Sequence, residues 1–307
     1  MRLVGEAFPF IEGSSYVLGM DSHNSVNGIR QFALSKGARV EYTPSTPQGG
    51  VDEPETKVLA LLLLQGQELT PHPQNVLAAN GPRRQLARPP CLFALTGLSN
   101  VTNSKNPLSL ITYASDLGYY TLLDAAALAP SSKISLRSVP ADAMAISFYK
   151  MFGFPTGVGC LVAKKSFLRQ LRRPWFAGGT VDVVQVPGTG FTAAQEIQEQ
   201  FEVPPLFPSF KYGPLKLSRA QEGTINFASL AAVTRGLDML SQYIPYLPLR
   251  LSTLLHHLVG SLAEIQHDVT CTPVARVLSR IPGQRLSAVG EQCETGSTVS
   301  LIFLEVG

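Results

Sequence analysis

Charged side chains are scarce in this chain of 307 residues, in which Asp, Glu, Lys and Arg together make up 15%. Typical soluble domains contain about 25%. With an apolar content of 45%, this scarcity excludes a disordered chain and a coiled coil, because both need many charged positions. The net charge is only +3, and the densest basic runs are the pairs Arg83-Arg84 and Arg172-Arg173. A nucleic-acid partner is therefore not expected.

Long apolar runs are absent as well. The longest, Val58 to Leu64, has seven residues, whereas a membrane-spanning helix needs about 20. Glu6 and Pro9 interrupt what would have to be the apolar part of an export signal. The four cysteines show no C-x-x-C spacing, which favours reduced thiols over a disulfide framework. These absences predict a soluble, cytoplasmic protein with no membrane partner, long enough for about two domains.

Apolar segments bounded by Gly and Pro predict an α/β fold with a mainly parallel sheet covered by helices. Residues 43–90 are rich in Pro, Gly, Gln and Asn, which predicts a variable surface insertion around one short strand, Lys57 to Leu64. A helix is expected at 25–37, with Ser25 as its N-cap and Gly37 as its C-cap. Further strands are expected at 91–97, 121–129, 143–148 and 157–164, further helices at 107–118, 226–243 and 248–265, and a closing strand with an open edge at 297–306.

Two polar residues follow predicted strands and could carry chemistry. Lys150 stands between an apolar strand and an aromatic, glycine-containing turn; such surroundings favour a neutral, nucleophilic amine. Asp124 ends the apolar run of the preceding strand, and pyridoxal phosphate enzymes use such a carboxylate to keep the ring nitrogen of the cofactor protonated. Taken singly, each has a simpler reading, a lysine that extends to solvent and an aspartate in a turn or helix cap.

Their order, an Asp after one strand and a Lys after the next, resembles the class V aminotransferase and cysteine desulfurase superfamily, a branch of the fold type I pyridoxal phosphate enzymes. The resemblance extends to the N-terminal domain of eukaryotic molybdenum cofactor sulfurases, of the fungal kind. It covers most of residues 1–40 and 91–260. Five motifs carry it: GMDSHNSVNGIRQFA, LLDAAALAP, SFYKMFGFPTGVGCLV, RRPWFAGGTV and EGTINF.

The resemblance implies a large domain that binds pyridoxal 5'-phosphate, 1–245, and part of a small C-terminal α+β domain, 246–307. It implies that Lys150 binds the cofactor covalently and that Asp124 contacts the ring nitrogen. His23 would stack on the ring and relay protons. Four further positions would complete the cofactor site. Asn100 would lie near the ring hydroxyl, and Ser147 and Tyr149 near the phosphate. Thr224 would reach the phosphate of a second subunit, which implies a homodimer.

The implied reaction takes sulfur from L-cysteine and passes it to the molybdenum cofactor through a further domain. No metal site is expected in this chain. The sequence departs from the family where a phosphate-binding loop would precede the first helix, and where a persulfide-forming cysteine would follow the last strand. Ala127 also replaces a common glutamine, and LTGLSN replaces a run that resembles Pro-Ala-Gln. Two alternatives therefore stay open: an inactive or fragmentary protein of this fold, and an enzyme that acts on another amino acid.

Overall fold

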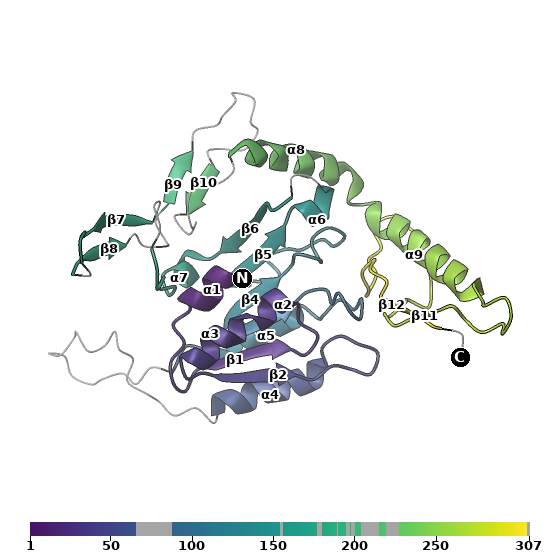
Figure 1. Ribbon diagram of the computed structural model, residues 1–307, viewed down its shortest axis with the longest axis horizontal. Coiled ribbons are helices and arrows are strands. Elements are labelled where there is room, and N and C mark those ends of the chain that lie inside the picture. Colours follow the sequence, from purple (N-terminus) through teal and green to yellow (C-terminus); the bar gives the residue numbers. More distant parts are fainter. Residues whose placement is uncertain are drawn as a thin grey trace.

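The computed structural model describes residues 1–65, 88–153, 156–176, 180–188, 190–194, 197, 200–203, 215–218 and 227–305. Its centre is a six-stranded sheet in the order β2-β1-β3-β4-β5-β6 (Figure 1). The first five strands run parallel, and β6 is antiparallel to β5. The strands are β1 Ser15–Gly19, β2 Arg39–Thr43, β3 Leu92–Thr96, β4 Tyr120–Asp124, β5 Ala143–Ser147 and β6 Gly159–Ala163.

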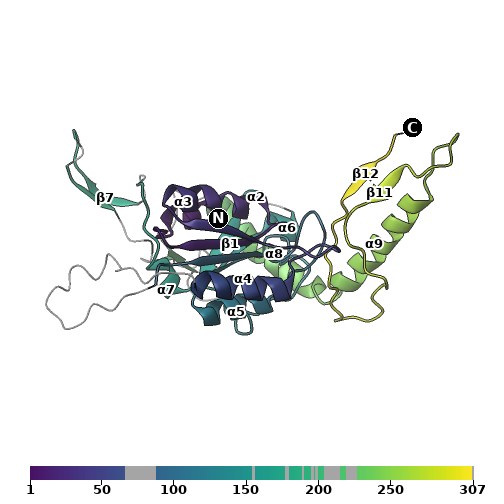
Figure 2. The ribbon, with the colours of Figure 1, turned by 90° about the horizontal axis from the view of Figure 1, so that it is seen from below.

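Helices cover both faces of this sheet, as predicted (Figure 2). Along each central strand, alternate residues face opposite layers. Tyr16 and Leu18 belong to the apolar cluster under α1 and α3, whereas Val17 belongs to the cluster under α4 and α5. The layers are built by α1 Arg2–Ala7, α2 Asn24–Asn27 and α3 Ile29–Ser35, and by α4 Glu53–Gln65 and α5 Ser109–Leu117.

The predicted strand Lys57 to Leu64 is wrong, because this segment belongs to helix α4. Apart from Val58, its apolar run consists of Leu and Ala, which favour helix. Val58 is the one β-branched residue of the run. The start carries helix signals: Asp52 Oδ1 accepts the Glu55 N–H at 3.0 Å, and two glutamates stand in the first turn. Ala60, Leu63 and Leu64 are buried against the sheet. Residues 53–65 are therefore part of the core, not of a surface insertion, and residues 66–87 lie outside the described part.

The predicted helix 25–37 is divided at Gly28 into α2 and α3, and its N-cap is His23, not Ser25. The C-cap of α3 is Lys36, not Gly37; Gly37 is the next residue and has a positive φ of 77°. The strand expected at 121–129 ends at Asp124, and residues 126–130 form turns. The helix predicted at 107–118 matches α5, and the strands predicted at 91–97, 143–148 and 157–164 match β3, β5 and β6.

Two long helices follow the central sheet along the chain. The two predicted helices 226–243 and 248–265 are confirmed as α8 Phe227–Tyr243 and α9 Leu247–Glu264. The closing strand is only three residues long, β12 Leu301–Phe303, and pairs on one side with β11 Ala275–Val277.

The domain boundary predicted at 245/246 coincides with the break between α8 and α9, and the division itself stays a prediction. Short elements complete the chain: α6 Tyr149–Phe152, α7 Lys165–Leu168, β7 Val181–Val184, β8 Thr192–Ala194, β9 Gln200–Val203 and β10 Leu215–Ser218.

None of the helices in the described ranges has the length and apolar character that crossing a bilayer requires.

Asn103 joins the loop after β3 to the C-terminal segment. Its side chain is fully buried, and its Nδ2 donates to the carbonyls of Arg280 and Gly296, both at 3.2 Å. Its Oδ1 accepts the Thr298 N–H at 3.0 Å. The backbone has a φ of 62°, a left-handed conformation that asparagine tolerates better than most residues. Hydrogen bonding and backbone conformation both specify Asn at this position.

We expect Asn103→Ala to lower the free energy of unfolding by about 3 kcal/mol, because it removes three part-buried hydrogen bonds and adds left-handed strain. Asn103→Gly removes the same hydrogen bonds without the strain, so it should cost about 1 kcal/mol less than Ala. Urea unfolding of the three proteins measures both differences. Losses below about 0.5 kcal/mol in both variants, the range of ordinary surface substitutions, would contradict this role.

Glu6 holds α1 against the segment before β7. Its carboxylate accepts from Arg2 Nε at 2.7 Å and from Trp175 Nε1 at 2.6 Å. Burial alone would raise the pKa of Glu6, but these hydrogen bonds and the charges of Arg2 and Lys36 outweigh it, so the pKa lies below its usual value of 4.5. The lowered pKa makes folding stability depend on pH.

The unfolded chain binds a proton at Glu6 at higher pH than the folded chain does, so the stabilisation by this carboxylate is present above about pH 4.5 and lost as the pH falls through the lower folded pKa. Glu6→Gln should therefore be less stable than the wild type at pH 7, and the difference should shrink as the solution is acidified below pH 4.5. Thermal unfolding at a series of pH values measures this. A difference that stays constant from pH 7 to pH 3 would show that the carboxylate charge is not involved.

Candidate functional site

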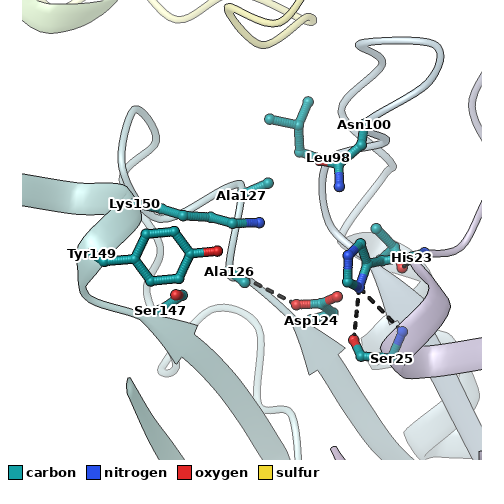
Figure 3. Close-up of a pocket in the computed structure, with 11 residues that line it drawn as sticks. His23, Ser25, Leu98, Asn100, Asp124, Ala126, Ala127, Ser147, Tyr149 and Lys150 are labelled. Carbon is teal, nitrogen blue, oxygen red and sulfur yellow. Dashed lines mark hydrogen bonds between the residues drawn. The ribbon is translucent and has the colours of Figure 1, made fainter. Parts of the chain in front are cut away.

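Three adjacent parallel strands end in polar residues at the same edge of the sheet. Thr96 ends β3, Asp124 ends β4 and Ser147 ends β5, and Thr96 is directly paired with Asp124. In open parallel sheets ligands bind beyond the carboxyl ends of the strands. A cavity of about 190 Å³ lies there (Figure 3). It is lined by His23, Ser25, Thr96, Leu98, Asn100, Asp124, Ala126, Ala127, Ser147, Tyr149 and Lys150.

The Asp124 carboxylate is held in a fixed position at the base of the cavity. Only 6% of the residue is exposed, and Oδ1 accepts the Ala126 N–H at 3.1 Å. The Asp124 carbonyl accepts the Gly97 N–H at 2.8 Å. A Cβ at Gly97 would lie 2.7 Å from Leu128 Cδ2 and 3.2 Å from the Asp124 carbonyl oxygen, so a larger residue would press on the backbone that carries Asp124. Among the described residues, no hydrogen bond is made to Oδ2, which leaves one carboxylate oxygen available to a group in the cavity.

Lys150 reaches into the cavity from the opposite wall. It lies in α6, one turn that follows β5, and its extended side chain brings the amine across the cavity towards His23 and Asn100 (Figure 3). No hydrogen bond or ion pair joins this amine to another residue of the described part. The Tyr149 ring lies beside Lys150 and Ser147 in the same view. The Lys150 residue is half-buried, and within the described part its amine has no hydrogen-bond or ion-pair partner.

His23 closes the other side of the cavity as the N-cap of α2. The backbone N–H of His23 donates to Thr96 Oγ1 at 3.3 Å, and the ring Nδ1 contacts Ser25. Below α2, the hydroxyl of Tyr16 donates to the Val26 carbonyl at 2.7 Å. Burial, followed by the charges of Tyr42 and Asp124, raises the pKa of Tyr16 well above its ordinary value. Tyr16 thus stays protonated and keeps this hydrogen bond to α2.

Asn100 lies on the loop after β3, above the cavity (Figure 3). The C-terminal segment holds this loop, because Ser300 Oγ donates to the Asn100 carbonyl at 3.2 Å and Asn103 bridges to the same segment. The position of the loop that carries Asn100 therefore depends on residues almost 200 positions further along the chain.

The structure brings six of the seven predicted site residues to this one cavity: His23, Asn100, Asp124, Ser147, Tyr149 and Lys150. Thr224, the seventh, lies outside the described residues, and the individual roles stay predictions. Sequence reasoning missed Thr96, Leu98 and Ala126 as lining residues. Thr96 could have been found, since it ends a predicted strand at the same edge as Asp124. Ser25 was assigned to a helix cap and instead contacts the true cap, His23.

The chain is similar in sequence to known proteins. The family described as Aminotransferase class-V matches residues 67–207. The molybdenum cofactor sulfurase of Solanum lycopersicum is 29% identical over 78% of this chain, and that of Bos taurus is 30% identical over 79%. The chain spans only 28% and 24% of the lengths of these two relatives.

Solved structures show the same fold. The cysteine desulfurase of Escherichia coli superposes over the whole of this chain and 61% of its own, with a TM-score of 0.61 and 19% identity. Its fold is that of the fold type I pyridoxal phosphate enzymes, a mainly parallel sheet with helices, and this confirms the predicted fold class. The chain therefore contains a segment that matches the Aminotransferase class-V family, is similar in sequence to molybdenum cofactor sulfurases, and shares its fold with cysteine desulfurases.

Proposed function

We propose that this chain binds pyridoxal 5'-phosphate in the cavity beyond β3, β4 and β5 and acts on L-cysteine as the desulfurase domain of a molybdenum cofactor sulfurase. The observation that carries the proposal is the convergence of Lys150, Asp124 and His23 on one cavity. The relatives that match most of the chain are named as molybdenum cofactor sulfurases, which supports this cofactor as the final acceptor of the sulfur.

The residues present fit this cofactor. An aldehyde needs an amine within reach, and the amine of Lys150 extends into the cavity. A protonated ring nitrogen needs a fixed anion, and Asp124 is buried with one oxygen open to the cavity. Tyr149 and Ser147 supply hydroxyl groups next to Lys150 for a phosphate, and Asn100 lies on the side of His23.

When bound, the cofactor supplies an electron-accepting ring that stabilises negative charge at the alpha carbon of the substrate. The Asp124 carboxylate would contact the ring nitrogen and favour its protonated form. Lys150 would hold the cofactor covalently, and its amine could move a proton on its own side of the cavity. His23 covers the opposite side and can exchange a proton there. In this proposal Lys150 anchors the cofactor, Asp124 gives electrostatic support, and Lys150 and His23 transfer protons.

The wider setting completes the proposal. Residues 1–245 would form the cofactor-binding domain, and 246–307 part of a small domain. We infer a cytoplasmic homodimer in which Thr224 of one subunit reaches the phosphate bound by the other. The relatives extend well beyond the matched segment, and the sulfur would pass to the molybdenum cofactor through a further domain of such a protein.

Purified protein incubated with pyridoxal phosphate and reduced with borohydride should carry a covalent adduct on Lys150, visible by absorbance and peptide mass. Lys150→Ala should lose the adduct, and because this amine makes no ion pair, the variant should still fold. Lys133→Ala, a change of an exposed lysine, is the matched control and should keep the adduct. A folded wild-type protein without an adduct, or with one on another lysine, would refute cofactor binding at this site and favour the inactive alternative.

Asp124→Asn should keep the adduct on Lys150, because the amide oxygen can still accept the Ala126 N–H, but it should slow chemistry at the alpha carbon by about 100-fold or more, a typical loss for a transition-state electrostatic group. The measurement is exchange of the alpha hydrogen of L-cysteine with D₂O, followed by NMR. Asp116→Asn, a change of an exposed carboxylate on α5, should exchange at the wild-type rate. Faster exchange with another amino acid than with L-cysteine would favour the alternative substrate class.

A further inference from the structure

The side chain of His23 is contacted at one ring nitrogen by two groups of the same residue. Nδ1 lies 3.2 Å from the backbone nitrogen of Ser25 and 2.8 Å from the Ser25 hydroxyl. Both contacts are drawn in Figure 3, where the rest of the ring faces the cavity. A backbone N–H can only donate a hydrogen bond, whereas a hydroxyl can donate or accept. Nδ1 must therefore present its lone pair to Ser25.

A neutral imidazole carries one proton, and the hydrogen bond at one nitrogen determines which nitrogen carries it. Since Nδ1 accepts from the Ser25 N–H, the proton is on Nε2. An Nδ1 without a proton can only accept hydrogen bonds, so the Ser25 hydroxyl must also donate to it. We propose that Ser25 is a positioning residue that fixes His23 in the Nε2–H tautomer and so presents a proton donor to the occupant of the cavity.

The surroundings of α2 support this assignment. The backbone of His23 is held by Thr96 Oγ1, and α2 is held from below by Tyr16 and by Asn27 Nδ2, which donates to the Ser22 carbonyl at 2.8 Å. No hydrogen bond to Nε2 comes from the residues that the structure describes. The ring is thus anchored on its Nδ1 side, and Nε2 is left for a ligand. Hydrogen-bond partners of this kind commonly fix histidine tautomers at functional sites.

The inference rests on the proposed function for its catalytic meaning, and it deepens the role of His23. A neutral His23 with its proton on Nε2 can give a proton to a group in the cavity, and it cannot accept one at that atom first. The proton transfer on the His23 side of the cavity therefore starts from donation by Nε2–H.

The test is ¹⁵N NMR of histidine-labelled protein without cofactor, in alkaline buffer where imidazole side chains are neutral. His23→Gln identifies the His23 signals. The wild-type protein should show Nε2 at the frequency of a protonated ring nitrogen and Nδ1 at that of an unprotonated one. A wild-type spectrum with Nδ1 protonated would overturn the assignment.

Ser25→Ala removes the hydroxyl and keeps the weaker 3.2 Å amide contact, so the minor Nδ1–H form should increase several-fold. Ser25→Thr restores a hydroxyl and should restore the wild-type pattern. Ser35→Ala, which removes an exposed hydroxyl that donates to the Phe32 carbonyl in α3, is the matched control and should change nothing. A Ser25→Ala spectrum identical to that of the wild type would overturn the role of the Ser25 side chain.

The NMR readout needs neither bound cofactor nor turnover. Failure of adduct formation at Lys150 would therefore refute the proposed function and leave the tautomer result standing. Ser35→Ala protein should form the Lys150 adduct to the same extent as the wild type, because Ser35 is exposed on α3 and does not line the cavity. Loss of the adduct in Ser25→Ala would mean that Ser25 maintains the whole cavity, and would overturn its specific role as a positioning residue.

Discussion

The burial of both faces of the parallel sheet is the constraint on which the site depends. The inner strands alternate between two apolar clusters, so a shift of one residue in any strand would expose one cluster and bury polar groups. This fixes the register, and the register fixes where each strand ends. Thr96, Asp124 and Ser147 consequently meet at one edge although they belong to separate segments of the chain.

Within that edge, the three ionisable groups differ in how firmly they are held. Asp124 is buried, and its backbone and carboxylate are both hydrogen-bonded to neighbours. His23 is held through one ring nitrogen, and the Lys150 amine has no partner among the described residues. A fixed anion can support charge at a constant position without reorganisation, whereas an unanchored amine can move between bonding partners. How firmly each group is held therefore matches the role that we propose for it. The fixed Asp124 carboxylate supports charge, and the unanchored Lys150 amine exchanges bonding partners.

Much of this arrangement could be predicted from the sequence. Lys150 and Asp124 were identifiable because each stands where an apolar strand ends, and the family resemblance added four further lining residues. The prediction failed for α4, because a short apolar run of Leu and Ala has no periodicity that separates a buried helix from a buried strand. It also failed for the N-cap, because histidine is not among the residues that commonly cap helices. The role of Asn103 could not be foreseen, since its partners lie about 180 to 200 residues away along the chain.

The bridge made by Asn103 has a thermodynamic consequence for the cavity. The loop that carries Asn100 is held in place by carbonyl and amide groups of residues 280–300. Any molecule that binds only when this loop is in position must also favour docking of the C-terminal segment, and by reciprocity the docked segment must strengthen binding of that molecule by the same factor. Occupancy of the cavity and protection of a distant surface segment from proteases are thus two measures of a single coupling free energy.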